Sequence, residues 1–165
     1  MQSLRTPLTR FAVVAVAAAA VGMTLPAVGQ QQNRISITTG GTGGVYYPMG
    51  GGMANILSKY IPGLQATAEV TGGSVDNLKL INAGKSEVGF TMADSAYDAV
   101  QGIDKFKDGK VGARTLMVLY PNKMHVVTVE GTGITKIADL KGKRVSTGSP
   151  GSGTEIMALR LLDAM

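Results

Sequence analysis

The spacing of hydrophobic and polar positions changes along the chain, and the changes predict strands and helices in turn. Ile35 and Ile37 lie on one side of a short β-prone segment, residues 35–39. Residues 64–71 alternate between apolar and polar side chains, which predicts a second strand. A helix is expected between these strands, because Met49, Met53, Ile56, Leu57 and Tyr60 recur at helical spacing.

Small and polar residues divide the rest of the chain into further elements. Ser74 is expected to cap a helix over residues 75–83, and Asp94 to cap the next helix. In that next helix Ala96, Ala99, Val100 and Ile103 are expected to share a face. We expect further strands at 88–91, 115–120, 124–129 and 144–147, helices at 135–140 and 154–164, and a solvated basic loop at 105–114. Alternating strands and helices predict an α/β fold with a largely parallel sheet.

The first 29 residues have the pattern of a signal peptide. Arg5 and Arg10 precede an uncharged segment, residues 11–23, and the small residues Ala27 and Gly29 follow. The apolar segment is shorter than the ~20 residues that a membrane span needs. We therefore expect cleavage after about Gly29 and export to the periplasm or the extracytoplasmic face, with an uncleaved anchor as the alternative.

Composition excludes several classes of protein. The chain of 165 residues has no cysteine, which excludes disulfides, thiol nucleophiles and thiolate metal sites. Its one histidine, His125, excludes a histidine-rich metal cluster, so no metal site is expected. The net charge is +5, and without Arg5 and Arg10 the balance is 14 − 11 = +3. This mild excess does not predict nucleic-acid binding.

Three glycine-rich turns are the part of the sequence that indicates a ligand-binding site: residues 40–44, 72–74 and 148–153. Each is expected between a strand and a helix, at the sheet edge where ligands bind in parallel α/β folds. Glycine lets backbone N–H groups approach a ligand, and the helix that follows offers unpaired N–H groups. At any one turn, tight turning and close packing explain glycine better than a ligand does, but the recurrence of three such turns with hydroxyl residues favours a small carboxylate.

The third turn also contains a helix-capping motif. Ser152 and Glu155 have the spacing of a capping box, with Ser152 as the N-cap and Glu155 at the third helical position. Glu155 is therefore expected to be structural rather than catalytic.

Nucleotide-binding and hydrolase motifs are absent from the sequence. There is no P-loop, and both G-x-G segments lack the last small residue of a dinucleotide fingerprint. Ser149 and Ser152 are not preceded by the glycine of a nucleophile elbow, since Thr147 and Pro150 stand there. We therefore expect no cofactor, no catalytic residue and no enzymatic activity.

Four segments resemble the TAXI family, the TRAP-associated extracytoplasmic solute-binding proteins. They are GTGGVYYPMGGGMA at 41–54, EVTGGSVDNLKLINAGKSEVGF at 69–90, YPNKMHVVTV at 120–129 and IADLKGKRVSTGSPGSGTE at 137–155. The resemblance implies a type II periplasmic-binding-protein-like fold, with two α/β lobes that close on a ligand. It further implies delivery of a small carboxylate (glutamate, glutamine, a 2-oxo acid or a dicarboxylate) to TRAP membrane permease subunits, and a receptor that is monomeric when full length.

The same resemblance implies which positions contact the ligand. They are Thr42, Gly44, Val45 and Tyr46 in the first turn; Gly73, Ser74 and Asn77 in the second; Asp94; and Ser149, Gly151, Ser152 and Thr154 in the third. This sequence departs from the family pattern at residues 91–94, because the family more often has a polar residue, typically Gln, shortly before the aspartate.

Length changes the expected domain organisation. After the signal peptide we expect a first lobe over residues 30–121 and the start of a second, truncated lobe over 122–165, which leaves that lobe incomplete. The alternatives to a receptor are an exported enzyme acting on a small carboxylate and an inactive truncated remnant.

Overall fold

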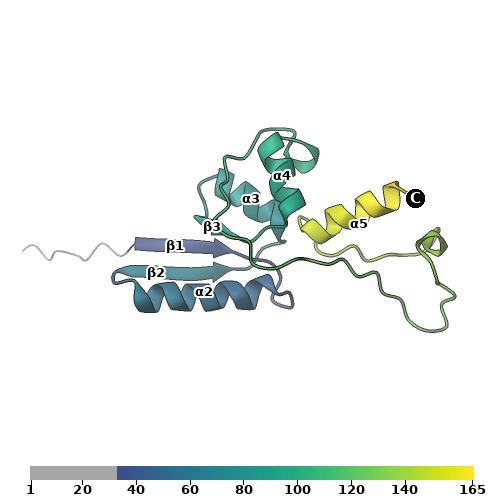
Figure 1. Ribbon diagram of the computed structural model, residues 1–165, viewed down its shortest axis with the longest axis horizontal. Helices are drawn as coiled ribbons and strands as arrows, with labels where there is room; N and C mark the ends of the chain where they lie inside the picture. The colour runs from purple at the N-terminus through teal and green to yellow at the C-terminus, as the bar shows by residue number, and fades with distance from the viewer. Residues whose placement is uncertain (1–32) are drawn as a thin grey trace, which may run out of the picture. The chain divides into compact units, whose positions relative to one another are not determined.

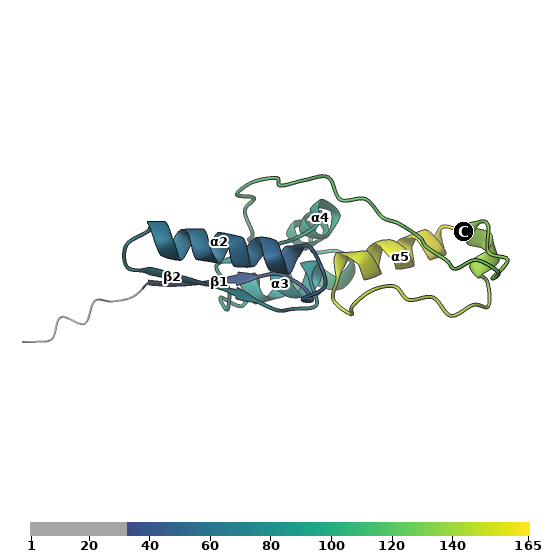
Figure 2. The same cartoon turned by 90° about the horizontal axis from the view of Figure 1, so that it is seen from below.

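The computed structural model describes residues 33–165, so the expected signal peptide lies outside the described residues. The elements are β1 (Asn33–Thr38), α2 (Tyr46–Tyr60), β2 (Leu64–Glu69), α3 (Ser74–Asn82), β3 (Val88–Gly89), α4 (Ala93–Gln101), η1 (Asp104–Phe106), η2 (Ile137–Leu140) and α5 (Gly153–Asp163). Figures 1 and 2 show them in two views.

The three strands form one parallel sheet in the order β2-β1-β3. Ile35 pairs with Ala66 across β1 and β2, and Ile37 pairs with Val88 across β1 and β3. The expectation of a mixed α/β fold with a parallel sheet is confirmed, and it is consistent with a periplasmic-binding-protein-like fold. The two-lobe arrangement stays a prediction.

Helix α2 packs on β1 and β2 through the apolar positions that its sequence spacing indicates. Ile37, Ala54, Ala66 and Phe90 are buried, and the partly buried Met49, Met53 and Leu57 pack against them. Gly50 allows the close approach, because a Cβ atom there would lie 2.4 Å from Thr39 Cγ2. Two expected members of the apolar face, Ile56 and Tyr60, are instead exposed.

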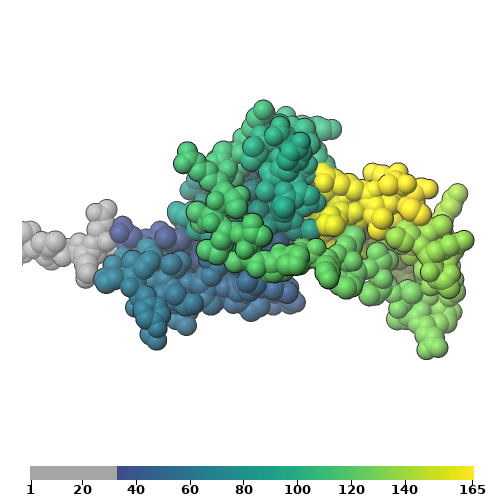
Figure 3. Space-filling model, viewed as in Figure 1, coloured from purple at the N-terminus to yellow at the C-terminus, as the bar shows by residue number. Residues whose placement is uncertain are grey.

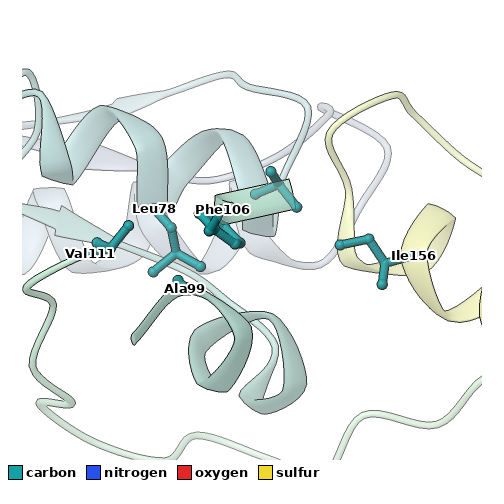
Figure 4. Close-up of a cluster of buried hydrophobic side chains, with 6 residues drawn as sticks. Leu78, Ala99, Phe106, Val111 and Ile156 are labelled. Atoms are coloured by element: carbon teal, nitrogen blue, oxygen red, sulfur yellow. The ribbon is translucent and has the colours of Figure 1, made fainter. Parts of the chain in front are cut away.

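A second buried cluster joins elements that are far apart in the sequence. The cluster contains Val75 and Leu78 of α3, Ala99 of α4, Phe106 of η1, Ile156 of α5, and Val111, which belongs to no helix or strand. Figure 4 shows Ile156 reaching toward this cluster from α5. This packing corrects the prediction of a fully solvated loop at residues 105–114, because Phe106 and Val111 are only 3% and 4% exposed.

The strands expected at 115–120, 124–129 and 144–147 do not form. These residues are described without regular secondary structure, and residues 112–130 run as an extended connection (Figures 1 and 2). Val118 and Val127 are 88% and 85% exposed. A strand is stable only when neighbouring strands satisfy its backbone groups, and β-prone composition alone does not supply them.

Two expected helix caps are also wrong. Gly73 is the N-cap of α3 and Met92 is the N-cap of α4, so Ser74 and Asp94 lie inside the first turns instead. The expected common face of α4 is likewise only partly buried, since Ala99 is buried whereas Val100 and Ile103 are 45% and 43% exposed. Asp98, which the apolar pattern passes over, is buried in their place.

Candidate functional site

The three glycine-rich turns meet in the structure. The first two follow β1 and β2, and the third precedes α5 without a preceding strand. A Cβ atom on Gly40 would lie 4.0 Å from Gly73 Cα, and one on Gly73 would lie 3.3 Å from Ser152 Cα. The expected gathering of these turns therefore holds, although the third reaches the site through α5 rather than through a strand.

Ser74 lies where three helices begin. It is the first residue of α3, and its Oγ accepts a hydrogen bond of 3.0 Å from the N–H of Met92, the N-cap of α4. A Cβ atom on Gly153, the first residue of α5, would lie 2.9 Å from that Oγ and 2.5 Å from Met92 Sδ. Glycine is therefore required at position 153, and Ser74 is 1% exposed.

The N-terminus of α3 is occupied by the third turn. The Gly151 carbonyl oxygen accepts hydrogen bonds from the N–H groups of Val75 and Asp76, at 3.0 and 3.4 Å. The Gly73 N–H donates to Thr71 Oγ1 at 3.1 Å. These N–H groups are used inside the protein, so the anion site expected at the second turn has few donors left.

The N-termini of α2 and α5 differ from that of α3. Within the described residues, the N–H groups of Val45, Tyr46 and Tyr47 donate to no other described residue, and neither do those of Gly153 and Thr154. Unpaired N–H groups at a helix start attract anions. The N–H groups of residues 93–95 at the start of α4 likewise donate to no described residue, but the Asp94 carboxylate lies in that turn and disfavours an anion there. The starts of α2 and α5 are therefore the part of the site better suited to a carboxylate.

The N-cap half of the capping box expected at α5 is confirmed, whereas the reciprocal bond from Glu155 to the N-cap N–H does not form. Ser152 is the N-cap, and its Oγ accepts a hydrogen bond of 3.0 Å from Glu155 N–H. The Glu155 carboxylate accepts from Gly151 N–H at 3.0 Å, one residue earlier than a standard capping box places it. The Ser152 hydroxyl is therefore used as a cap.

Tyr46 connects the first turn with the residues around Ser74. Burial raises the pKa of the Tyr46 phenol above its ordinary 10.0, a hydrogen bond with Ser74 opposes this, and the nearby Tyr120 and Asp94 raise the pKa further. The ring of Tyr46 packs on Phe90 with a centroid distance of 5.2 Å. Tyr46, Ser74 and Asp94 thus belong to one neighbourhood.

Asn77 is completely buried below this neighbourhood. Its Nδ2 donates to the carbonyl oxygens of Thr39 and Phe90 at 2.6 and 2.7 Å, and its Oδ1 accepts from Thr71 Oγ1 at 2.6 Å. Both amide hydrogens are used, which gives Asn77 a structural role at the ends of β1 and β3. Contact between Asn77 and a ligand stays a prediction.

The other residues that the resemblance implies lie at the surface of the turns. Thr42, Gly44 and Val45 are exposed at the start of α2, and Ser149 and Thr154 are exposed around the start of α5. Gly151 and Ser152 are half-buried, and Gly73 is buried between them and Gly40. The structure brings the three groups of residues together, and their binding role stays a prediction.

Sequence reasoning did not single out Arg160 or Tyr120. Arg160 of α5 forms ion pairs with Asp98 of α4, with Asp104 at 2.8 Å and with Asp94 at 3.6 Å. The hydrogen bond with Asp98 is the main reason that the pKa of Arg160 is raised. The helical spacing of α5 indicates only its apolar face, so no local sequence pattern predicted the ion pairs between Arg160 and the three aspartates.

Two kinds of feature are absent from residues 33–165. No group of three or more acidic or histidine side chains there could hold a metal ion. None of the helices in this part of the chain is long and apolar enough to cross a membrane.

The parallel α/β core, with helix starts gathered around Ser74, is consistent with a substrate-binding protein. The model of the NMT1-like family matches residues 37–165. The chain therefore belongs to the NMT1-like family, a periplasmic solute-binding type of family, and this family suggests an extracytoplasmic substrate-binding role. The resemblance to solute-binding proteins is confirmed at this level.

Proposed function

We propose that the chain is an extracytoplasmic solute receptor of the TAXI type, which binds a small carboxylate for a TRAP permease. One observation carries the proposal: N–H groups at the starts of α2 and α5 donate to no described residue, and both helix starts lie beside the buried Ser74. The four sequence segments that resemble TAXI proteins contain both helix starts.

Physical chemistry favours a carboxylate at this place. The first turn of a helix combines free N–H donors with the positive end of the helix dipole, and both stabilise a negative group. The exposed hydroxyls of Thr42 and Thr154 add donors beside the two helix starts. A carboxylate has two oxygens, and each can accept hydrogen bonds from donors of this kind.

Backbone amide NMR of the chain tests this proposal. Glutamate, 2-oxoglutarate and succinate should shift the amide signals of Val45, Tyr46, Gly153 and Thr154 in a saturable manner. Succinamide, which lacks the negative charge, should shift them much less. Equal shifts with succinamide, or no shifts at these amides with any carboxylate, would contradict the proposal.

A matched pair of variants sharpens the test at α5. Thr154→Pro removes one N–H donor in the first helical turn, where proline is tolerated, whereas Thr154→Ala removes only the hydroxyl. We expect the proline variant to weaken the response at Gly153 more than the alanine variant does. The ligand signals in the same samples separate binding from turnover, since a receptor leaves the ligand unchanged and an exported enzyme consumes it.

The second half of the proposal is that the chain is exported and delivers its ligand to TRAP permease subunits. Mass spectrometry of the envelope fraction should find a mature start near Gln30. Purification from membranes should recover TRAP permease subunits with the receptor. An unprocessed Met1 on a protein outside the envelope would contradict this half without affecting the ligand site.

A further inference from the structure

A pocket of about 560 Å³ lies beside Asp94, between α5 and the extended connection. Its walls are mostly apolar, from Met124, Val126, Ile137, Met157 and Leu161. Asp94 and Arg160 are its charged lining residues. Figure 3 shows a hollow between α5 in yellow and the green connection.

The charges around the pocket do not balance. One guanidinium, that of Arg160, faces the three carboxylates of Asp94, Asp98 and Asp104. Asp98 and Asp104 are within hydrogen-bond distance of Arg160, whereas Asp94 is 3.6 Å from it. In the part of the chain that the structure describes, no hydrogen bond to the Asp94 carboxylate is formed. Asp94 shares the guanidinium of Arg160 with two closer carboxylates, so its negative charge on the wall of the apolar pocket is only partly compensated.

Asp94 also belongs to the proposed carboxylate site. It follows the α4 N-cap, Met92, by two residues, and Met92 contacts both Ser74 and the position of Gly153. The pocket and the helix starts thus share one boundary. Asp94 is also close enough to Tyr46, the first residue of α2, for its charge to raise the pKa of the Tyr46 phenol.

We propose that the ligand is an α-amino acid with an apolar side chain, whose ammonium group pairs with Asp94 and whose side chain fills the pocket. This inference rests on the proposed function, because the helix starts bind the ligand carboxylate. The charge of Asp94 attracts an ammonium group and repels a second carboxylate. Dicarboxylates are consequently poor ligands for this pocket, and 2-oxo acids lack the group that pairs with Asp94.

Five defined compounds test the inference on the full chain: leucine, 4-methylpentanoate, 3-methylbutylamine, glutamate and succinate. Methyl-labelled methionine reports on the pocket through Met124 and Met157, and the amides of Gly153 and Thr154 report on the carboxylate site. Leucine should shift both sets of signals. It should bind roughly tenfold or more tightly than 4-methylpentanoate, which lacks the ammonium group, and more tightly than glutamate, whose side chain is charged.

Two variants with the same change of charge separate Asp94 from its neighbours. Asp94→Asn should abolish the preference for leucine over 4-methylpentanoate. Asp104→Asn, which removes another carboxylate from Arg160 but does not line the pocket, should keep it. If Asp94→Asn does not fold, the comparison of leucine with 4-methylpentanoate on the unaltered chain decides the question.

The possible failures are distinguishable. Equal binding of leucine and 4-methylpentanoate, with amide shifts but without methionine shifts, would overturn the amino-acid inference and leave the carboxylate receptor standing. Absence of amide shifts with every carboxylate would overturn both. Methionine shifts with 3-methylbutylamine alone would show an amine pocket unconnected to the carboxylate site, which also overturns the inference.

Discussion

The Asn77 side-chain amide donates a hydrogen bond of 2.7 Å to the Phe90 carbonyl oxygen, and so ties α3 to the residue that follows β3. Its second hydrogen goes to Thr39, which follows β1. A single buried amide thus fixes the spacing between the ends of two strands, directly beneath the helix starts that we propose as the binding site.

Asn77→Ala should destabilise the protein strongly. The change removes the side-chain donor from the Phe90 carbonyl oxygen in a buried place, at a cost of about 1–3 kcal/mol. The Thr39 carbonyl oxygen loses one donor but keeps that of Thr71 Oγ1. Urea unfolding measures the difference. Asn82→Ala, at the exposed end of the same helix, should change the free energy of unfolding by less than about 0.5 kcal/mol. Similar values for the two variants would contradict the structural role of Asn77.

Gly50→Ala and Gly51→Ala should have opposite effects. A Cβ at position 50 would clash with Thr39 Cγ2, whereas one at position 51 meets nothing within 4 Å. We expect Gly50→Ala to destabilise by about 1–3 kcal/mol and Gly51→Ala to stabilise by up to about 1 kcal/mol through helix propensity. Thermal unfolding of both variants checks the sign, and stabilisation by Gly50→Ala would show that α2 does not pack this closely.

Replacing Arg160 should loosen the contact of α5 with α4. Arg160→Met leaves Asp98, whose side chain is 4% exposed, without its partner. Since Arg160 itself is 43% exposed, we expect a loss of about 1–3 kcal/mol, below that for a fully buried pair. Hydrogen exchange of the α5 amides should accelerate. Arg144→Met, at an arginine that forms no ion pair with a described residue, is the control and should leave α5 unchanged.

The raised pKa of Tyr46 predicts that the folded protein loses stability at high pH. Because the pKa of Tyr46 is raised in the folded protein, the unfolded chain loses this proton first, near pH 10. The contribution of Tyr46 is therefore complete below pH 10 and disappears as the pH rises through the higher, folded pKa. Urea midpoints should fall less steeply above pH 10 in Tyr46→Phe than in the unaltered protein. Identical pH profiles would contradict the raised pKa.

Local patterns predicted the first half of the described chain well. The alternation in residues 64–71 and the helical spacing around Met53 placed β2 and α2, because both patterns reflect burial against a neighbour that is present. The spacing of Ser152 and Glu155 predicted the start of α5 for a similar reason, since capping depends on atoms within one turn.

Long-range pairing could not be predicted in this way. Val118 and Val127 have strand-forming side chains, but a strand also requires a partner with free backbone groups, and the local sequence does not report one. Ser74 looked like an N-cap because serine often is one, whereas its hydroxyl bonds Met92, 18 residues away. The convergence of the turns was predictable, but which helix starts keep free N–H groups was not, because Gly151 blocks α3 from the other end of the chain.

The bond between Val75 and Gly151 joins two backbone groups, so it does not depend on the side chain at either position. Separation of the third turn from α3 would expose the N–H groups of Val75 and Asp76 to water together. The rate at which these two amides exchange with solvent deuterium therefore reports the equilibrium between contact and separation of the third turn and α3. At such moments these two N–H groups would become free donors at the start of α3, which makes the anion affinity of this edge depend on the contact between the third turn and α3.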